Sequence, residues 1–277
     1  MAVILVCIVL VLAGLAVAVR WGGLAVPPAP GEGRDWGLVA RRYLWYVNVA
    51  VIAGLGAGLL IAGAGGRLAM RLLAVTAGPE VQGTLTEAEE VVGEITAGGT
   101  TGFIIFTALF MGLPTGALYL LVRRWLPSGR LAGLAFGALL LVTLATRVDP
   151  LRPANVDFDV VGPGWVSVAV FSALALVHGM VVAGLAGWAG HHLPLLGRSP
   201  KAVAAYLPVV ALVLFPPVAV VVVLTGAVVV LLSQARPVAD LWRSARLVVA
   251  GRVLLVVLLA VTLPTFTAAV AGILGRP

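Results

Sequence analysis

Residues 63–94 read GAGGRLAMRLLAVTAGPEVQGTLTEAEEVVGE, and the rest of the chain is organised around them. They leave an apolar segment through glycines, place Arg67 and Arg71 one helical turn apart and cross a short polar loop. They then lead through a cluster of glutamates toward the next apolar segment. No other part of the chain gathers charge so close to apolar segments, so these residues hold the first candidates for a functional site.

The composition of the chain predicts an integral membrane protein. Of its 277 residues, 61% are hydrophobic and 10% are charged, whereas a soluble domain carries about 25% charged residues. The apolar residues come in long unbroken runs rather than in alternation, which disfavours a transmembrane β-barrel. We therefore expect an all-α fold, a polytopic transmembrane helical bundle that forms a single domain over residues 1–277.

Apolar runs of about 20 residues, the length needed to cross a bilayer, define the predicted spans. Seven are expected, at residues 2–19, 43–64, 100–122, 131–146, 165–189, 202–232 and 245–263. The second can continue as helix to Arg71, and Pro264 should end the last. Residues 22–42, which contain PPAPGEG at 27–33, form a linker rich in proline and glycine after the first span.

The sixth span is ambiguous, since residues 202–232 are too many for one straight crossing and too few for two. Pro216 and Pro217 lie in its middle, and proline kinks a helix because it lacks a backbone donor. The segment is either one kinked crossing, which gives seven spans, or a re-entrant hairpin, which gives eight.

The formal net charge of +7 indicates an anionic partner. Because the arginines lie beside apolar runs, we expect that partner to be membrane lipid with anionic headgroups rather than nucleic acid. The loops after the first and third spans are the most basic, and such loops face the cytoplasm. This pattern places the N-terminus outside and, with seven spans, the C-terminus inside.

The charged residues of the central stretch form two expected stripes. Arg67 and Arg71 share one helix face, and Glu87, Glu90 and Glu94 have the spacing to share another. Unpaired charges near a membrane are costly, so the simplest arrangement is an ionic clasp between two antiparallel segments. The alternative is a ligand site, with an anionic headgroup or solute on the arginines, or a cation or proton on the glutamates.

Two ionisable residues fall inside predicted spans, His178 and Arg252. An intramembrane ionisable group is a functional candidate by default. His178 is either a neutral side chain bonded to a neighbouring helix or part of a proton path. Arg252 either extends to the interface or meets His178 or a lipid phosphate.

Motifs for metal, nucleotide or nucleophile chemistry are missing from the sequence. Cys7 is the only cysteine, and HExxH, GxSxG and Walker A patterns do not occur. The sequence therefore predicts no catalytic residue, no metal and no cofactor, and it leans away from an enzyme.

Small residues recur at helical spacing in three of the predicted spans. They are Gly54, Gly58, Ala62 and Gly66, then Gly112 and Gly116, then Gly133 and Gly137. Such ladders let helices approach closely in lipid. They favour packing within the bundle, and the sharper alternative is a homo-oligomer formed through these faces.

Three segments together resemble hypothetical multi-pass membrane proteins of high-GC bacteria, a family without an established activity. They are GGRLAMR at 65–71, GEIT at 93–96 and GPGWVSVAVF at 162–171. The resemblance implies a bacterial plasma membrane protein and carries over no site residue. Three functions remain open: a non-enzymatic module that binds lipid or a partner protein, a transporter or channel for small solutes or ions, and a membrane enzyme acting on lipid.

Overall fold

The computed structural model describes residues 1–33, 35–87, 91–148, 150–214, 216–235, 241 and 244–276. Within these residues the secondary structure is helical, with one isolated bridge between Leu85 and Val91 and no strand. The all-α class predicted from the composition is confirmed.

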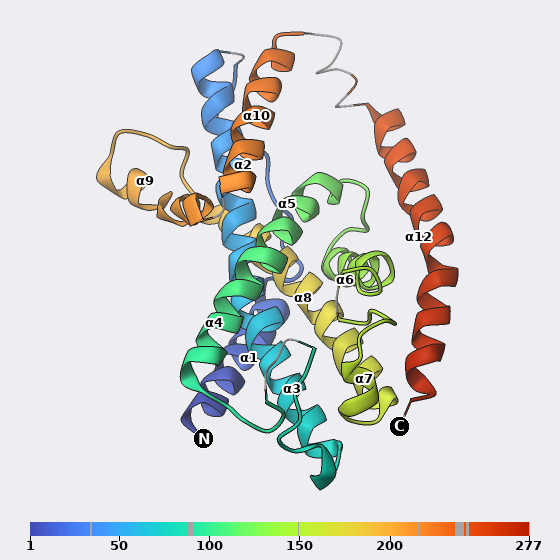
Figure 1. Cartoon of the computed structure of the whole chain (residues 1–277). Helices are drawn as coiled ribbons and strands as arrows, with labels where there is room; N and C mark the ends of the chain where they lie inside the picture. The colour runs from blue at the N-terminus through green and yellow to red at the C-terminus, as the bar shows by residue number, and fades with distance from the viewer. Residues whose placement is uncertain are drawn as a thin grey trace.

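Six helical segments of the described chain are long and apolar enough to cross a membrane. Two of them are continuous through a π-helical turn. The segments are α1 (Ala2–Trp21), α2–η1–α3 (Trp36–Ala57, Gly58–Gly63 and Ala64–Thr76), α4–η3–α5 (Ala97–Thr107, Ala108–Gly112 and Leu113–Val122), α8 (Gly164–His192), α10 (Pro216–Ser233) and α12 (Ala245–Leu274). Figure 1 shows them as one elongated bundle with α12 at its edge.

Two predicted spans are replaced by shorter pieces. The fourth is α6 (Arg130–Leu144), whose 15 residues rise about 22 Å, less than the hydrocarbon core of about 30 Å. The sixth divides into α9 (Pro200–Ala204), the 3₁₀-helix η4 (Leu207–Leu214) and α10. Of these three pieces only α10 is long enough to cross, so residues 202–232 are not one kinked helix.

The expected end at Pro264 is wrong, because α12 continues through this residue to Leu274. Proline is more frequent in transmembrane helices than in soluble ones. The predicted linker is also shorter, because α2 already begins at Trp36, capped by the Asp35 carboxylate, which accepts from the Leu38 amide at 3.1 Å.

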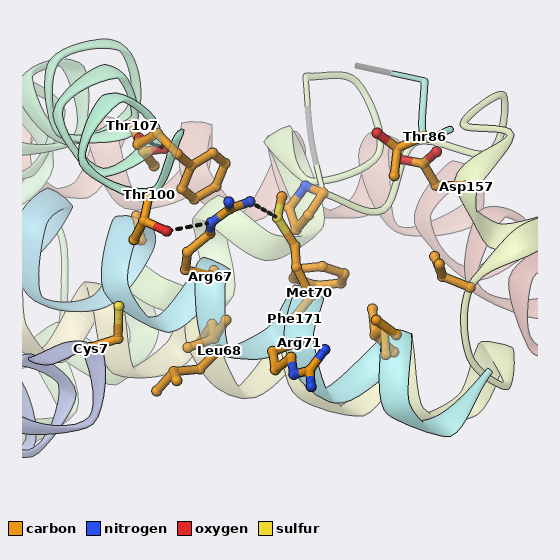
Figure 2. A pocket seen from close by; sticks show the side chains of 18 of the residues that line it. Cys7, Arg67, Leu68, Met70, Arg71, Thr86, Thr100, Thr107, Asp157 and Phe171 are labelled. Atoms are coloured by element: carbon orange, nitrogen blue, oxygen red, sulfur yellow. Dashed lines mark hydrogen bonds between the residues drawn. The ribbon is translucent and has the colours of Figure 1, made fainter. Parts of the chain in front are cut away.

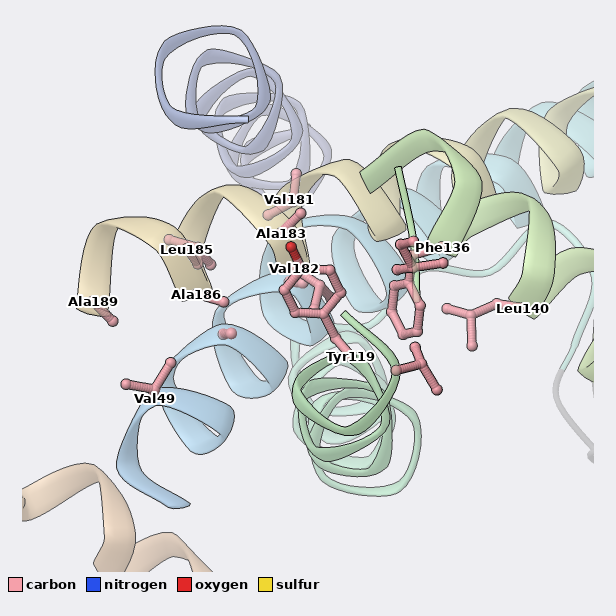
Figure 3. Packing of buried hydrophobic residues seen from close by; sticks show 14 of the residues in the cluster. Val49, Tyr119, Phe136, Leu140, Val181, Val182, Ala183, Leu185, Ala186 and Ala189 are labelled. Carbon is pink, nitrogen blue, oxygen red and sulfur yellow. The ribbon is translucent and has the colours of Figure 1, made fainter. Parts of the chain in front are cut away.

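The main core lies where α2, α5, α6 and α8 meet. Figure 3 shows Tyr119 beside Phe136, with Val49 nearer to Ala186, and all of them belong to one buried cluster. The glycine ladders serve this packing. A Cβ at Gly54 would overlap the carbonyl of Gly112. Helices α6 and α8 approach equally closely, with Gly133 and Gly137 against Gly179.

Both chain ends lie at one end of the molecule, beside α3 and the short helix α7 (Asp157–Val160) (Figure 1). The connections 77–96 and 145–163 lie at this end as well. The prediction of seven spans placed the two termini on opposite sides of the membrane. In the structure both termini lie at the same end of the bundle.

Candidate functional site

Two π-helical turns set the geometry of the candidate site. η1 interrupts the long helix between α2 and α3, η3 interrupts the helix between α4 and α5, and the two turns pack against each other. A π turn inserts a residue and changes the direction and face of the helix beyond it. On one side of the turns α2 and α5 pack closely, whereas on the other α3 and α4 have few contacts.

A cavity of about 1000 Å³ occupies the space that α3 and α4 leave open. Helices α1, α6 and α8 and the connections 77–96 and 145–163 complete its wall. Much of the wall is apolar and includes Phe103, Phe106, Leu140, Leu141, Phe171 and Leu174. Figure 2 shows the side of this wall from which Arg67 and Arg71 project.

Arg67 projects from α3 and is held by three neighbours. Its Nε donates to Thr100 Oγ1 at 3.3 Å, its Nη1 contacts Met70 Sδ at 3.9 Å, and its guanidinium carbon lies 5.8 Å from the centre of the Phe103 ring (Figure 2). Thr100 is 3% exposed. The guanidinium is therefore fixed by neutral groups at the cavity wall.

Arg71 lies one turn further along α3 and donates from Nη1 to the Gly93 carbonyl at 3.2 Å. No carboxylate of a described residue lies within 4.0 Å of either guanidinium. The expected clasp of these arginines with glutamates is therefore absent from the described residues. Glu90, one of the predicted members of that clasp, lies outside them.

The described residues of the segment 77–96, which are 77–87 and 91–96, do not form the expected helix. They contain the 3₁₀ turn η2 (Pro79–Val81), bends and the Leu85–Val91 bridge. Gly78, Gly83 and Gly93 have φ angles of 93°, 86° and 94°, a region that glycine enters readily and that does not continue a right-handed helix. Glu87 and Glu94 therefore share no helix face. The next helix, α4, is capped by Thr96, whose hydroxyl accepts from the Gly99 amide at 3.1 Å.

Glu87 instead connects the two loops at the cavity. It forms an ion pair with Arg152, and its amide donates to Asp157 Oδ1 at 2.7 Å. The hydrogen bond from Arg152 lowers the pKa of the Glu87 carboxyl. Sequence reasoning missed Arg152, because it lies in an irregular connection with no periodic pattern to relate it to residue 87. Glu94 also lines the cavity but is exposed.

His178 lines the same cavity from the middle of α8 and is 6% exposed. Its Nε2 lies 2.9 Å from Thr115 Oγ1, and the Thr115 hydroxyl donates to the Gly112 carbonyl at 2.8 Å. Which imidazole nitrogen carries the proton decides whether His178 or Thr115 is the donor in this contact. Nδ1 is buried and has no hydrogen-bond partner of good geometry among the described residues. The Ala57 backbone carbonyl also lies close to the imidazole, so the ring contacts this acceptor as well as the Thr115 hydroxyl.

Arg252 is separate from this site. It is exposed on α12 and does not line the cavity. The structure thus brings Arg67, Arg71, Glu87, Glu94 and His178 to one cavity and leaves Arg252 outside it. Thr100, Thr107 and Thr115 are further polar lining residues that sequence reasoning did not select, because threonine is common in apolar helices and carries no charge.

No family model, curated protein or solved structure matches this chain. The resemblance to multi-pass proteins of high-GC bacteria remains a prediction.

Proposed function

We propose that the protein is a membrane-embedded binding module for an anionic amphiphile, a lipid or fatty acid whose headgroup is a phosphate or carboxylate. The headgroup would bind Arg67 and Arg71, and the apolar chain would occupy the cavity beside them. One observation carries the proposal: two guanidinium groups without a carboxylate partner among the described residues lie on the wall of a largely apolar cavity of about 1000 Å³.

The donors of the two arginines suit this role. A guanidinium has five N–H donors, and the described contacts use two at Arg67 and one at Arg71. Hydrogen bonds between charged partners stabilise by about 1.5–3 kcal/mol, more than those between neutral partners. A headgroup oxygen would therefore find donors already oriented by Thr100, Met70 and Gly93.

The apolar wall suits the rest of the amphiphile. Burying hydrocarbon contributes about 0.8 kcal/mol per CH₂ when the reference is water. A ligand arriving from the bilayer gains much less, because its chain is already out of water. The charge of the headgroup should therefore decide which ligands bind. The length of the acyl chain should affect affinity only through how well the chain fills the cavity.

The proposal includes a location in a bacterial plasma membrane. The start of α2 and the end of α5 lie away from the termini (Figure 1). These two ends carry the basic residues Arg41, Arg42, Arg123 and Arg124. Basic loops face the cytoplasm, so the connections 77–96 and 145–163, the cavity between them and the N-terminus would face outward. The C-terminus lies at the same end and would also face outward, in place of the inside position that seven crossings predicted.

Native mass spectrometry of the protein in a nonionic detergent tests the proposal. Dodecanoate should bind, dodecanol of equal chain length should bind at least tenfold more weakly, and the combined Arg67→Gln and Arg71→Gln variant should remove that difference. Arg252→Gln is the matched control, because it removes a positive charge from a helix that does not line the cavity. Equal binding of acid and alcohol by the unaltered protein would refute the proposal.

Transport is the second candidate function. The observation that favours it is the depth of the cavity, which reaches His178 at the midpoint of α8, the depth at which many transporters bind their substrates. Transport predicts that reconstituted protein moves the anionic amphiphile between vesicle leaflets, whereas a binding module changes the amount bound and not the rate of transfer. No observation favours a lipid-modifying enzyme, since no carboxylate of a described residue contacts His178.

A further inference from the structure

The cavity beside Arg67 is not closed on all sides, and α4 and α6 leave a space between them. Helix α4 packs against α3, η1 and η3, whereas α6 packs against α8 and α12, and the two helices have little contact with each other. Figure 1 shows them apart. Because both helices line the cavity, the space between them connects the cavity to the outside of the bundle.

The rim of this opening is apolar. Phe106 of α4 and Leu144 of α6 line the cavity, and they are also 54% and 37% exposed. The Phe106 ring stacks on the Phe110 ring with centroids 4.3 Å apart, and Phe110 is exposed without lining the cavity. Phe106 therefore marks the boundary between the cavity and the outer face of α4. Exposed apolar side chains are favourable in hydrocarbon and unfavourable in water, so the opening suits the bilayer.

The opening is bounded along the bundle on two sides. Toward the core it ends where Tyr119 packs edge-on against Phe136, with ring centroids 5.2 Å apart. At the other end, the two loops at the cavity are joined by the ion pair between Glu87 and Arg152. Polar contacts therefore connect the loops on the aqueous side, and the apolar opening between α4 and α6 faces the bilayer.

The rim lies further from the loops than the arginines do. Arg67 bonds Thr100 and lies over the Phe103 ring, and Phe106 follows three residues later on α4, about 4.5 Å further along the helix axis. A lipid whose headgroup binds Arg67 therefore has its acyl chains at the level of the opening. One chain can enter the cavity while the other stays in the bilayer.

We propose that the bound amphiphile is an anionic diacyl lipid of the bilayer, which lies across the opening between α4 and α6. One acyl chain fills the cavity, and the second lies over Phe106 and Phe110 in the surrounding hydrocarbon. This inference rests on the proposed function, and it narrows the ligand from amphiphiles in general to membrane lipids with two chains. A cavity entered only from the aqueous side would accept single-chain fatty acids instead, because a second chain would have no apolar surroundings.

Native mass spectrometry in a nonionic detergent tests this lipid class. The probes are dimyristoyl phosphatidylglycerol, dimyristoyl phosphatidylcholine, which has the same chains and no net charge, and dodecanoate. The unaltered protein should bind the phosphatidylglycerol about fivefold more tightly than the phosphatidylcholine, which corresponds to about 1 kcal/mol. The combined Arg67→Gln and Arg71→Gln variant should lose that ratio.

A variant at the rim connects diacyl binding to the opening. Leu144→Trp places a larger side chain where the lipid passes from the cavity to the bilayer. Overpacking of this kind costs at least about 1 kcal/mol, so the affinity for phosphatidylglycerol relative to dodecanoate should fall about fivefold. Leu134→Trp is the matched control, because Leu134 is also exposed on α6 and does not line the cavity.

Photolabelling provides a second measurement that needs no variant and serves if Leu144→Trp fails to fold. Phosphatidylglycerol with a diazirine at the middle of each chain is supplied in nanodiscs, and labelled peptides are mapped by mass spectrometry. Label should appear both at Leu174 on the cavity wall and at Phe110 on the outer face. Phosphatidylcholine with the same chains should label the outer face alone.

The outcomes separate the two proposals. Phosphatidylglycerol that labels Leu174 and Phe110, and that binds more weakly relative to dodecanoate in Leu144→Trp than in Leu134→Trp, supports the diacyl ligand. If dodecanoate binding depends on Arg67 and Arg71 but the lipid labels the outer face alone, or the two tryptophan variants behave alike, the diacyl ligand is overturned and the proposed function stands. If neither dodecanoate nor phosphatidylglycerol binds the unaltered protein better than the double arginine variant, the proposed function is overturned and the diacyl ligand with it.

Discussion

The two sides of the π-helical turns pack in opposite ways, although they belong to the same two helical segments. Where α2 meets α5, glycines bring the backbones into contact, and a Cβ at Gly54 or Gly112 would overlap the carbonyl of the other residue. Where α3 faces α4, Arg67 and Phe103 line an open cavity, and a Cβ at Gly102 would meet nothing within 4 Å. At Gly102, unlike at Gly54 and Gly112, glycine makes no close contact with a neighbouring helix.

This difference shows that a sequence of small residues does not define a helix contact by itself. In lipid, helices associate through close packing, because the surrounding chains are as apolar as the helices. The closed side uses that packing for stability. The open side forgoes it and keeps charged and polar groups at the wall of a cavity, as a binding site requires.

The largest expected effect is on the closed side. Gly112→Ala should lower the free energy of unfolding by about 3 kcal/mol, the upper part of the range for overpacking, because the added methyl group meets backbone that cannot change rotamer. Thermal unfolding in detergent measures the loss. Gly98→Ala is the control, since a Cβ there meets nothing within 4 Å; equal destabilisation by both variants would contradict the close contact.

The next effect concerns the charges of the open side. The combined Arg67→Gln and Arg71→Gln variant should bind dodecanoate at least tenfold more weakly, since charged hydrogen bonds contribute about 1.5–3 kcal/mol. Its thermal stability should change little, because neither arginine has an ion pair among the described residues. Unfolding of the double variant at much lower temperature would instead assign the arginines a structural role.

A smaller effect of opposite sign is expected from filling the cavity. Gly102→Leu should raise the free energy of unfolding by up to about 1 kcal/mol through helix propensity, and it should weaken dodecanoate binding by occupying space in the cavity that Gly102 lines. Thermal unfolding and native mass spectrometry measure the two changes. Gly98 is in the same helix but does not line the cavity. Gly98→Leu should therefore raise the free energy of unfolding without weakening dodecanoate binding.

The smallest effect concerns the loops. Because the folded pKa of Glu87 is lowered from its ordinary value of 4.5, mainly by the Arg152 hydrogen bond, the pair stabilises the loop contact above that value. The stabilisation is lost as pH falls through the lower folded pKa. Hydrogen exchange of residues 77–87, compared between the unaltered protein and Glu87→Gln at each pH, measures it. The difference between the proteins should be present near neutral pH, vanish below the folded pKa and shrink with added salt; a difference independent of pH would contradict the pairing.

Composition and hydropathy were sufficient to predict the helical class and the approximate position of most apolar helices. Arg67, Arg71 and His178 were also found from the sequence, because charge inside or beside an apolar run is rare. Their common cavity could not be predicted. It depends on η1 and η3, and a π turn has no periodic sequence signature while it changes the face of every residue beyond it.

The sequence-based predictions that the structure contradicts failed for local physical reasons. Glu87 and Glu94 have helical spacing, yet Gly78, Gly83 and Gly93 take left-handed backbone angles that interrupt any helix. The partner of Glu87 is Arg152, a contact between two irregular connections that no spacing rule relates. Pro264 was predicted to end the last helix by a rule derived for helices in water, whereas proline is more frequent inside transmembrane helices.

The position of a bound acyl chain tests the central claim most directly. A dodecanoate derivative with a photoreactive diazirine at mid-chain should label residues of the cavity wall, among them Phe103, Phe106 and Leu174, when labelled peptides are mapped by mass spectrometry. The combined Arg67→Gln and Arg71→Gln variant should lose that labelling. Label confined to the outward faces of α10 and α12, and equal in the two proteins, would contradict a headgroup-directed binding cavity.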